Sequence, residues 1–251
     1  MIKIDGKKIA EEILAEIDLE RVEGLRLVAI LVGENESSRK FLKVKAGVAK
    51  RLGVEFELLE IEEEVGQKDL EVIVEKISGD RRNDFVILQL PLPAKFKREK
   101  VIAKIDSQKD IDNLKSEDVF VSPAVGAMLE IFKRFDLDWQ KKKIGLVGGG
   151  FLVGGPIGRF LTKKGVWFEV ATEETKDLKD FLKDKEIIIT GTGVADLFSG
   201  ENLMVGASVI DFGYPGDLEK KDLEKLNYCT PTPGGMGPIL VACLFKNIIR
   251  E

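Results

Sequence analysis

The sequence contains no histidine among its 251 residues. This absence excludes a Ser-His-Asp triad, a metal site with histidine ligands and a histidine general base. Proton transfer near neutral pH must therefore use lysine, aspartate, glutamate, tyrosine, cysteine or water.

Cysteine is scarce as well. The two cysteines, Cys229 and Cys243, are too few for a disulfide framework and lack the spacing of metal ligands. We expect both to be buried thiols in a reducing compartment, so the sequence predicts a cytoplasmic protein without a metal site. No hydrophobic run is long enough to cross a bilayer and no signal peptide opens the chain, so no membrane partner is expected.

Neither positively nor negatively charged residues are concentrated in any one segment of the chain. The formal net charge is -5, and lysine and arginine are mixed with acidic residues along the whole chain. This balance argues against a nucleic-acid partner. A hydrophobic content of 44% and a charged content of 33% are typical of a globular protein with one large or two small domains.

Apolar segments typical of strands alternate with helical segments along the chain. Strands are expected at residues 2–6, 25–32, 54–61, 85–90, 143–147, 166–170, 186–190 and 207–211. The alternation predicts the α/β class with parallel sheets. We predict an N-terminal α/β domain over residues 1–121 and a Rossmann-type domain over residues 122–238, with a cleft between them. A helix at 123–135 is expected to connect the domains, and a final helix at 239–251 to pack back on the first.

A glycine-rich segment, Gly148 to Pro156, follows the predicted strand at 143–147 and precedes a helix start at Ile157. A strand, a glycine turn and a helix N-terminus form a site for the phosphates of a dinucleotide, because glycine permits close approach and the helix start offers free N–H groups. The alternative is a tight strand–helix turn without a ligand.

Several separated segments together resemble one enzyme family. They are Ile4-Asp5-Gly6-Lys7, Leu31 to Asn35 with Ser38 and Lys45, Gln89-Leu90-Pro91-Leu92-Pro93, Lys109 to Asp112, Val153 to Pro156, Val209 to Gly213, and Thr230 to Pro238. The chain is similar to the bifunctional methylenetetrahydrofolate dehydrogenase/methenyltetrahydrofolate cyclohydrolases. The resemblance implies oxidation of 5,10-methylenetetrahydrofolate with NAD or NADP and hydrolysis of the methenyl product to 10-formyltetrahydrofolate. It also implies a homodimer formed through the Rossmann domain.

The resemblance assigns catalytic roles to Lys45, Gln89 and Asp112. A lysine shielded from water in a cleft can exchange protons near neutral pH, and without histidine Lys45 is also a natural candidate on chemical grounds. The amide of Gln89 is expected to hold Lys45 and the folate. Asp112 is expected to accept two hydrogen bonds from the pterin. Without a catalytic role, Lys45 would be a solvated lysine, Gln89 a polar residue at a strand end and Asp112 an aspartate that forms a turn. Asp110 could form such a turn as well. Ser38 is expected to cap the helix that carries Lys45.

The family pattern also suggests residues that contact substrate and cofactor. Substrate contacts are expected at Phe41, Asp112, Pro233, Gly234, Gly235 and Gly237. Cofactor contacts are expected at Gly148, Gly149, Gly150, Val153, Gly154, Glu173, Gly191, Gly213 and Tyr214.

The sequence departs from the family pattern at several places, including Gly149 and Gly150, where NADP-linked members carry polar or basic side chains, and a divergent segment from Leu114 to Phe120. Phe41 stands where the family usually has tyrosine; its ring can still stack on the folate, but a hydroxyl that could tune Lys45 is missing. Asn113 replaces a glycine, and asparagine tolerates the positive φ that the turn needs. Glu173 follows the strand at 166–170, where NADP-linked members often carry a phosphate-binding side chain. An acid there favours a free ribose hydroxyl, so we predict a preference for NAD, with Glu169 and Glu174 as rivals for this role.

Other functions stay open at this point. The protein could be a dehydrogenase that has lost the cyclohydrolase step, a nucleotide-binding protein without turnover, or an amino-acid dehydrogenase. The last does not account for the Gln-Leu-Pro-Leu-Pro and Pro-Gly-Gly-Met-Gly-Pro strings.

Overall fold

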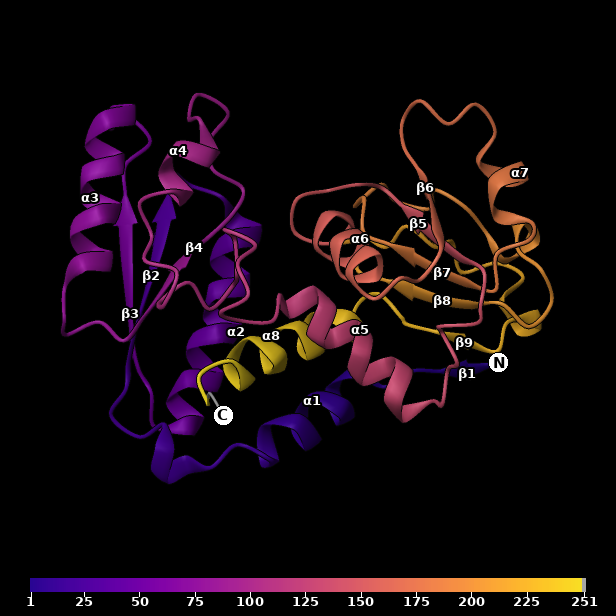
Figure 1. The fold of residues 1–251 in the computed structure, drawn as a ribbon, viewed down its shortest axis with the longest axis horizontal. Coiled ribbons are helices and arrows are strands. Elements are labelled where there is room, and N and C mark those ends of the chain that lie inside the picture. Colours follow the sequence, from indigo (N-terminus) through magenta and orange to yellow (C-terminus); the bar gives the residue numbers. More distant parts are fainter. Residues whose placement is uncertain (250–251) are drawn as a thin grey trace. The chain divides into compact units, whose positions relative to one another are not determined.

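The computed structural model describes residues 1–249 and divides the chain into two compact units. The first comprises Met1–Ile13 and Pro123–Cys243 and is called the six-stranded unit. The second comprises Leu14–Ser122 and the chain from Leu244 onward and is called the three-stranded unit (Figure 1). Residues 250–251, which the sequence places in the final helix, lie outside the described part.

The six-stranded unit is built on one parallel sheet. In sheet order its strands are β1 (Ile2–Lys3), β9 (Tyr228–Cys229), β8 (Ser208–Asp211), β7 (Ile187–Thr190), β5 (Ile144–Val147) and β6 (Phe168–Ala171). Its helices are α5 (Pro123–Arg134), α6 (Gly154–Lys163), α7 (Leu178–Leu182), the first part of α1 (Gly6–Ala15) and most of α8 (Met236–Lys246). This arrangement confirms the predicted Rossmann-type sheet.

The central strands of this sheet are buried along their whole length, which explains their continuous apolar sequence. One core cluster contains Val147, Ile188 and Val209 from three neighbouring strands, together with Leu182 of α7 and Phe198. The turns that follow these strands all lie at the carboxyl edge of the sheet. In open α/β sheets this edge binds ligands.

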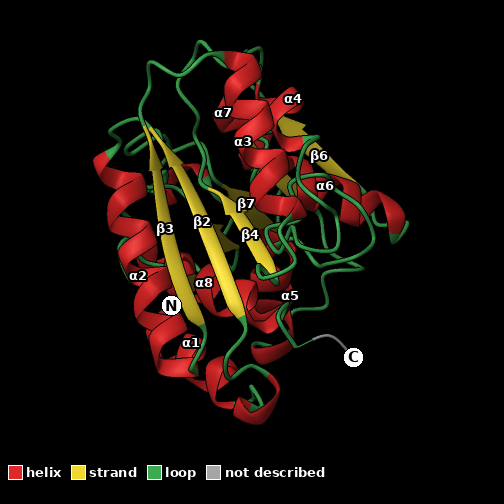
Figure 2. Ribbon diagram, turned by 90° about the vertical axis from the view of Figure 1, so that its left-hand side faces the viewer, coloured by secondary structure: helices red, strands yellow, loops and turns green. Residues whose placement is uncertain are grey.

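The three-stranded unit contains a parallel sheet in the order β3 (Glu55–Ile61), β2 (Arg26–Val32) and β4 (Phe85–Leu88), as Figure 2 shows. Its helices are α2 (Glu36–Leu52), α3 (Gln67–Gly79) and α4 (Arg98–Ile102), with a short 3-10 helix η1 (Leu19–Arg21). Nearly all of β2 is buried, whereas the edge strand β3 is largely exposed. The α/β prediction for this half of the chain is also confirmed.

Helix α2, which carries Lys45, begins at Glu36, one turn before the start that a cap at Ser38 predicts. The side chain of Asn35 accepts the backbone N–H of Ser38 at 2.8 Å, so Asn35 is the N-cap and the prediction of Ser38 was wrong. The helix ends at Gly53, which has a φ of 75°.

The units are not simple consecutive segments. Residues 1–13, which the sequence placed with the N-terminal domain, group with the six-stranded unit because Ile2 and Lys3 pair with Tyr228 and Cys229. The chain from Leu244 onward groups with the three-stranded unit. Helices α1 and α8 therefore each continue from one unit into the other. Within residues 1–249, no helix has both the length and the apolar character needed to span a bilayer.

Candidate active site

Lys45 is the centre of a polar cluster in the three-stranded unit. Its side chain is only 5% exposed, and its Nζ lies 3.6 Å from Asp112 Oδ2 and 3.4 Å from Gln89 Oε1. The ring of Phe41, one turn earlier on α2, has its centroid 5.2 Å from the same Nζ. The structure thus brings together a buried ammonium group, a carboxylate, an amide oxygen and an aromatic face.

The backbone around Gln89 fixes the direction of its side chain. Gln89 directly follows β4, and its N–H donates to Ile30 O at 2.9 Å. Its Nε2 donates to the carbonyl oxygen of Leu90 at 2.7 Å, which leaves Oε1 directed at Lys45. Lys45 therefore faces an acceptor that is anchored to the carboxyl end of a buried strand.

Asp112 lies on a loop that is held at several points. Asn113 has a φ of 51°, as predicted for this position, and its Nδ2 donates to Phe120 O at 2.7 Å. Asn247 Nδ2 donates to Ile111 O and to Val121 O, both at 2.8 Å. Asn247 was not found from the sequence, because nothing in its local pattern links it to a loop more than a hundred residues away.

Asp110 supports the same loop from within. It is 2% exposed, and its Oδ2 accepts the N–H of Lys115 at 3.0 Å. Its other oxygen, Oδ1, is buried and has no hydrogen-bond partner among the described residues. Desolvation raises the pKa of Asp110 to about 6. The carboxyl group of Asp110 thus supports the loop, and its ionisation costs free energy because the charged form is buried.

The glycine-rich loop lies in the six-stranded unit, between β5 and α6. A Cβ on Gly154 would lie 1.9 Å from Gly148 O, so the loop closes tightly at these two glycines, and Gly148 has a φ of 89°. A Cβ added at Gly149 or Gly150 would meet no described atom within 4 Å, so packing within the described residues does not require glycine at these two positions. Helix α6 begins at Gly154 and has no side-chain cap. The loop thus offers room and free N–H groups for a phosphate.

The turns after β7 and β8 lie beside this loop. A Cβ on Gly191 would lie 3.0 Å from Val153 Cγ1, and one on Gly213 would lie 2.3 Å from Asp217 Oδ1. Tyr214 is 75% exposed. The predicted cofactor residues Val153, Gly191 and Gly213 therefore belong to one packed edge, and Asp217, missed from the sequence, lies within it.

The acidic residues near β6 differ in their surroundings. Glu173, two residues beyond the end of β6, is exposed, as is Glu174. Glu169 on β6 instead forms an ion pair with Lys185 at 2.6 Å. The carboxylate of Glu169 is thus held in an ion pair, whereas Glu173 and Glu174 are exposed to solvent.

The predicted substrate residues Pro233, Gly234, Gly235 and Gly237 lie in the six-stranded unit, between β9 and the first turn of α8. Gly6 N donates to Gly234 O at 3.0 Å, and a Cβ on Gly6 would lie 1.8 Å from Gly235 O. The start of α1 is thus locked against this turn, and only glycine fits at position 6.

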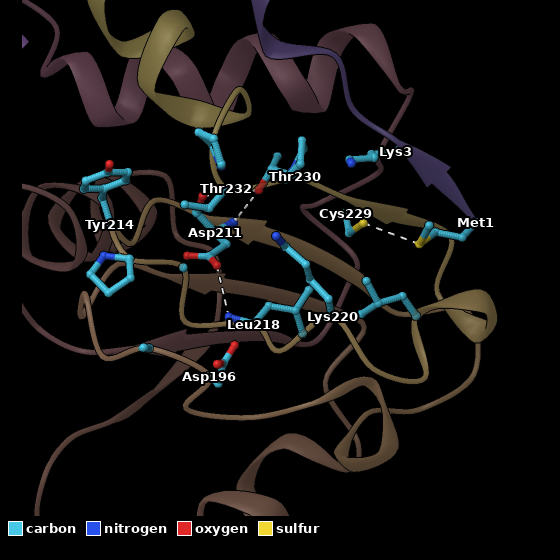
Figure 3. Close-up of a pocket in the computed structure, with 16 residues that line it drawn as sticks. Met1, Lys3, Asp196, Asp211, Tyr214, Leu218, Lys220, Cys229, Thr230 and Thr232 are labelled. Carbon is cyan, nitrogen blue, oxygen red and sulfur yellow. Dashed lines mark hydrogen bonds between the residues drawn. The ribbon is translucent and has the colours of Figure 1, made fainter.

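A pocket of about 580 Å³ opens in the same unit between β1, β9 and the β8–β9 connection. Figure 3 shows Asp211 in its lining, with its N–H donating to Thr230 Oγ1 at 2.7 Å and its Oδ2 accepting from Leu218 N at 3.0 Å. Burial raises the pKa of Asp211 to about 6. Tyr214 and Pro233, predicted to contact ligands, also line this pocket.

Both halves of the chain match one family. Residues 4–112 match the tetrahydrofolate dehydrogenase/cyclohydrolase catalytic domain, and residues 122–251 match the NAD(P)-binding domain of the same family. A bifunctional protein FolD from Listeria innocua is 30% identical over 271 residues, which cover 98% of this chain and 95% of the relative.

Solved structures are similar over nearly the whole chain. FolD from Campylobacter jejuni has a TM-score of 0.89 at 26% identity, covering 99% of this chain and 97% of that one. The Trypanosoma brucei dehydrogenase-cyclohydrolase, complexed with NADP cofactor and an inhibitor, has a TM-score of 0.89 at 25% identity, covering 98% and 95%.

Proposed function

The chain belongs to the tetrahydrofolate dehydrogenase/cyclohydrolase family, and we infer that it is a bifunctional enzyme of folate metabolism. It oxidises 5,10-methylenetetrahydrofolate to 5,10-methenyltetrahydrofolate with a nicotinamide cofactor and hydrolyses the product to 10-formyltetrahydrofolate. The observation that supports this proposal is the cluster of Lys45, Gln89 and Asp112, in which a buried lysine side chain lies beside a carboxylate and an amide oxygen.

We assign each member of the cluster a separate task. Asp112 accepts hydrogen bonds from the 2-amino and ring N–H groups of the pterin, and Phe41 offers an aromatic face to stack on the folate. Lys45 exchanges the proton that the attacking water gives up when the methenyl cation is hydrolysed. Gln89, anchored through Leu90, keeps the Lys45 side chain in place during this exchange.

The glycine loop has the features that a dinucleotide requires. Gly148 and Gly154 close the turn, while Gly149 and Gly150 leave open space where a pyrophosphate would fit against the start of α6. When bound, the nicotinamide ring supplies the hydride acceptor. The residues of this chain bind the phosphates and ribose and keep the loop rigid.

We propose that NAD is preferred over NADP. Glu173 stands just beyond β6, where a carboxylate favours a free ribose hydroxyl and repels a 2′-phosphate. Gly149 and Gly150 provide no side chain that could bind the extra phosphate.

We also propose that the enzyme is a homodimer formed through the six-stranded unit. Strand β6 is an edge of the sheet, and both Trp167 beside it and Val170 on it expose large apolar side chains, at 60% and 43%. Replacing Val170 with lysine would convert a dimer into a monomer in sedimentation analysis, and a wild-type monomer would contradict the proposal.

The buried thiols Cys229 and Cys243 suit the reducing cytoplasm that we propose for the enzyme.

A spectroscopic assay tests the main proposal. The full-length protein is incubated with 5,10-methylenetetrahydrofolate and NAD or NADP in parallel, and hydrolysis of the methenyl compound is then followed without nucleotide. We expect turnover with NAD and accelerated loss of the methenyl absorbance. No turnover with either cofactor would contradict the dehydrogenase function, and hydrolysis no faster than in buffer would contradict the cyclohydrolase function.

A further inference from the structure

Asp217 is a fully buried carboxylate in the six-stranded unit, outside the set of residues to which we gave a role. We propose that Asp217 is the positioning residue of the nucleotide-binding edge. Its carboxylate holds the turn after β7 in the shape that supports the glycine loop, and thereby sets the affinity for the nicotinamide cofactor. This inference rests on the proposed function, because it concerns the cofactor of that same enzyme.

Within residues 1–249, the Asp217 carboxylate accepts three hydrogen bonds, all from donors at the end of β7. Oδ2 accepts from Thr190 Oγ1 and from Thr192 N, the latter at 2.8 Å, and Oδ1 accepts from Gly193 N at 2.8 Å. Strand β7 ends at Thr190, so the N–H groups of the following turn need partners outside the sheet. An ionised carboxylate accepts hydrogen bonds without donating any, so it suits all three donors.

The turn held by Asp217 packs directly against the glycine loop. A Cβ on Gly148 would lie 2.9 Å from Thr192 Cγ2, and one on Gly191 would lie 3.0 Å from Val153 Cγ1. Thr192 is thus fixed through its N–H by Asp217, while its methyl group contacts the first glycine of the loop. A shift of this turn would therefore move the backbone that binds the phosphates.

Asp217 is itself held rigidly. The next residue, Leu218, donates its N–H to Asp211 Oδ2 at 3.0 Å, and Phe198 N donates to the backbone oxygen of Asp217 at 3.2 Å. On its other side, Gly213 leaves space only because it has no side chain, since a Cβ there would lie 2.3 Å from Asp217 Oδ1. The carboxylate thus links the turns after β7 and β8 at the carboxyl edge of the sheet.

Asp217→Asn is the first test, because it keeps the shape and replaces one acceptor with an NH₂ donor. In either orientation of the amide this donor faces a backbone N–H, that of Thr192 or that of Gly193, so the turn has to shift. We expect the KM for NAD to rise about tenfold or more, the usual consequence of one mismatched buried hydrogen bond. The KM for 5,10-methylenetetrahydrofolate should stay within about twofold of wild type, a difference of a few tenths of a kcal/mol.

The second activity of the enzyme serves as an internal control for folding. Hydrolysis of methenyltetrahydrofolate without nucleotide uses the cluster around Lys45, which belongs to the other unit, so it should persist in Asp217→Asn. Glu224→Gln, an exposed acid on the same connection, should leave every parameter unchanged. An unchanged KM for NAD in Asp217→Asn, or equal losses in the KM values of both substrates, would overturn the inference.

If Asp217→Asn loses both activities, the variant Thr190→Val tests the positioning role of Asp217 instead. This variant removes one donor but keeps the carboxylate and its two backbone hydrogen bonds. A raised KM for NAD with retained hydrolysis supports the positioning role, whereas no change or a parallel loss overturns it. A wild-type protein without either activity would contradict the proposed function itself, whatever the variants do.

Discussion

Replacing Asp110 with asparagine should stabilise the protein at neutral pH. The carboxyl group is 2% exposed, one oxygen has no partner among residues 1–249, and burial raises its pKa from 3.8 to about 6. The folded state therefore binds a proton more tightly than the unfolded chain between these two pH values. Wild-type stability falls as pH rises through this window, whereas an amide has no proton to lose.

The size of the effect follows from the shift in pKa. A difference of about 2 pKa units at about 1.4 kcal/mol per unit corresponds to about 3 kcal/mol at pH values well above 6. The amide oxygen of the substituted side chain would still accept the N–H of Lys115, and its NH₂ group would occupy the place of the unpartnered oxygen. For a chain of this length, the gain corresponds to a rise in Tm of roughly 6 to 12 °C.

Calorimetric unfolding of both proteins at several values between about pH 4 and about pH 8 measures this effect. The Tm difference between Asp110→Asn and wild type should be small at the acidic end and grow with pH. Asp18→Asn is the matched control, since Asp18 is an exposed acid of the same unit and asparagine can also cap η1. A Tm difference that stays constant across this range would refute the argument from burial.

Three further substitutions test the assigned roles. Lys45→Met should lower the hydrolysis of methenyltetrahydrofolate about a hundredfold or more, because the proton-exchanging group is lost, while NAD binding measured by calorimetry stays near normal. Glu173→Ser should raise the ratio of kcat/KM for NADP to that for NAD about tenfold, because a like charge beside the 2′-phosphate is removed. Gly6→Ala should destabilise the protein by about 3 kcal/mol in thermal unfolding, because the added Cβ would lie 1.8 Å from Gly235 O.

Each of these has a matched control in the same chain. Lys43→Met changes an exposed lysine of α2 and should leave hydrolysis intact; a fully active Lys45→Met would remove Lys45 from the mechanism. If Glu174→Ser and not Glu173→Ser changes the cofactor ratio, Glu174 is the selector. Gly47→Ala adds a Cβ that has no atom within 4 Å apart from its chain neighbours and the backbone of its own helix, so it should be neutral or slightly stabilising.

Periodicity and composition were sufficient for most of the fold. The strands at Arg26–Val32 and Ile144–Val147 are apolar runs that a parallel sheet buries on both faces, and their positions differ from prediction by a residue or less at each end. Strand β9 was missed because two residues, Tyr228 and Cys229, are too few to show a pattern. Its pairing with β1 is what assigns the N-terminal residues to the six-stranded unit.

The cluster around Lys45 was predictable because its residues stand in unusual sequence strings. Lys45, Gln89 and Asp112 lie in segments that resemble a family, and the structure brings their side chains together within one unit. Asp217 and Asn247 had no such signal. Their partners are backbone N–H and carbonyl groups, which every residue other than proline provides, so no particular residue type at a distant position indicates the contact. Side chains that hold a loop or turn through backbone groups therefore become visible only once the chain is folded.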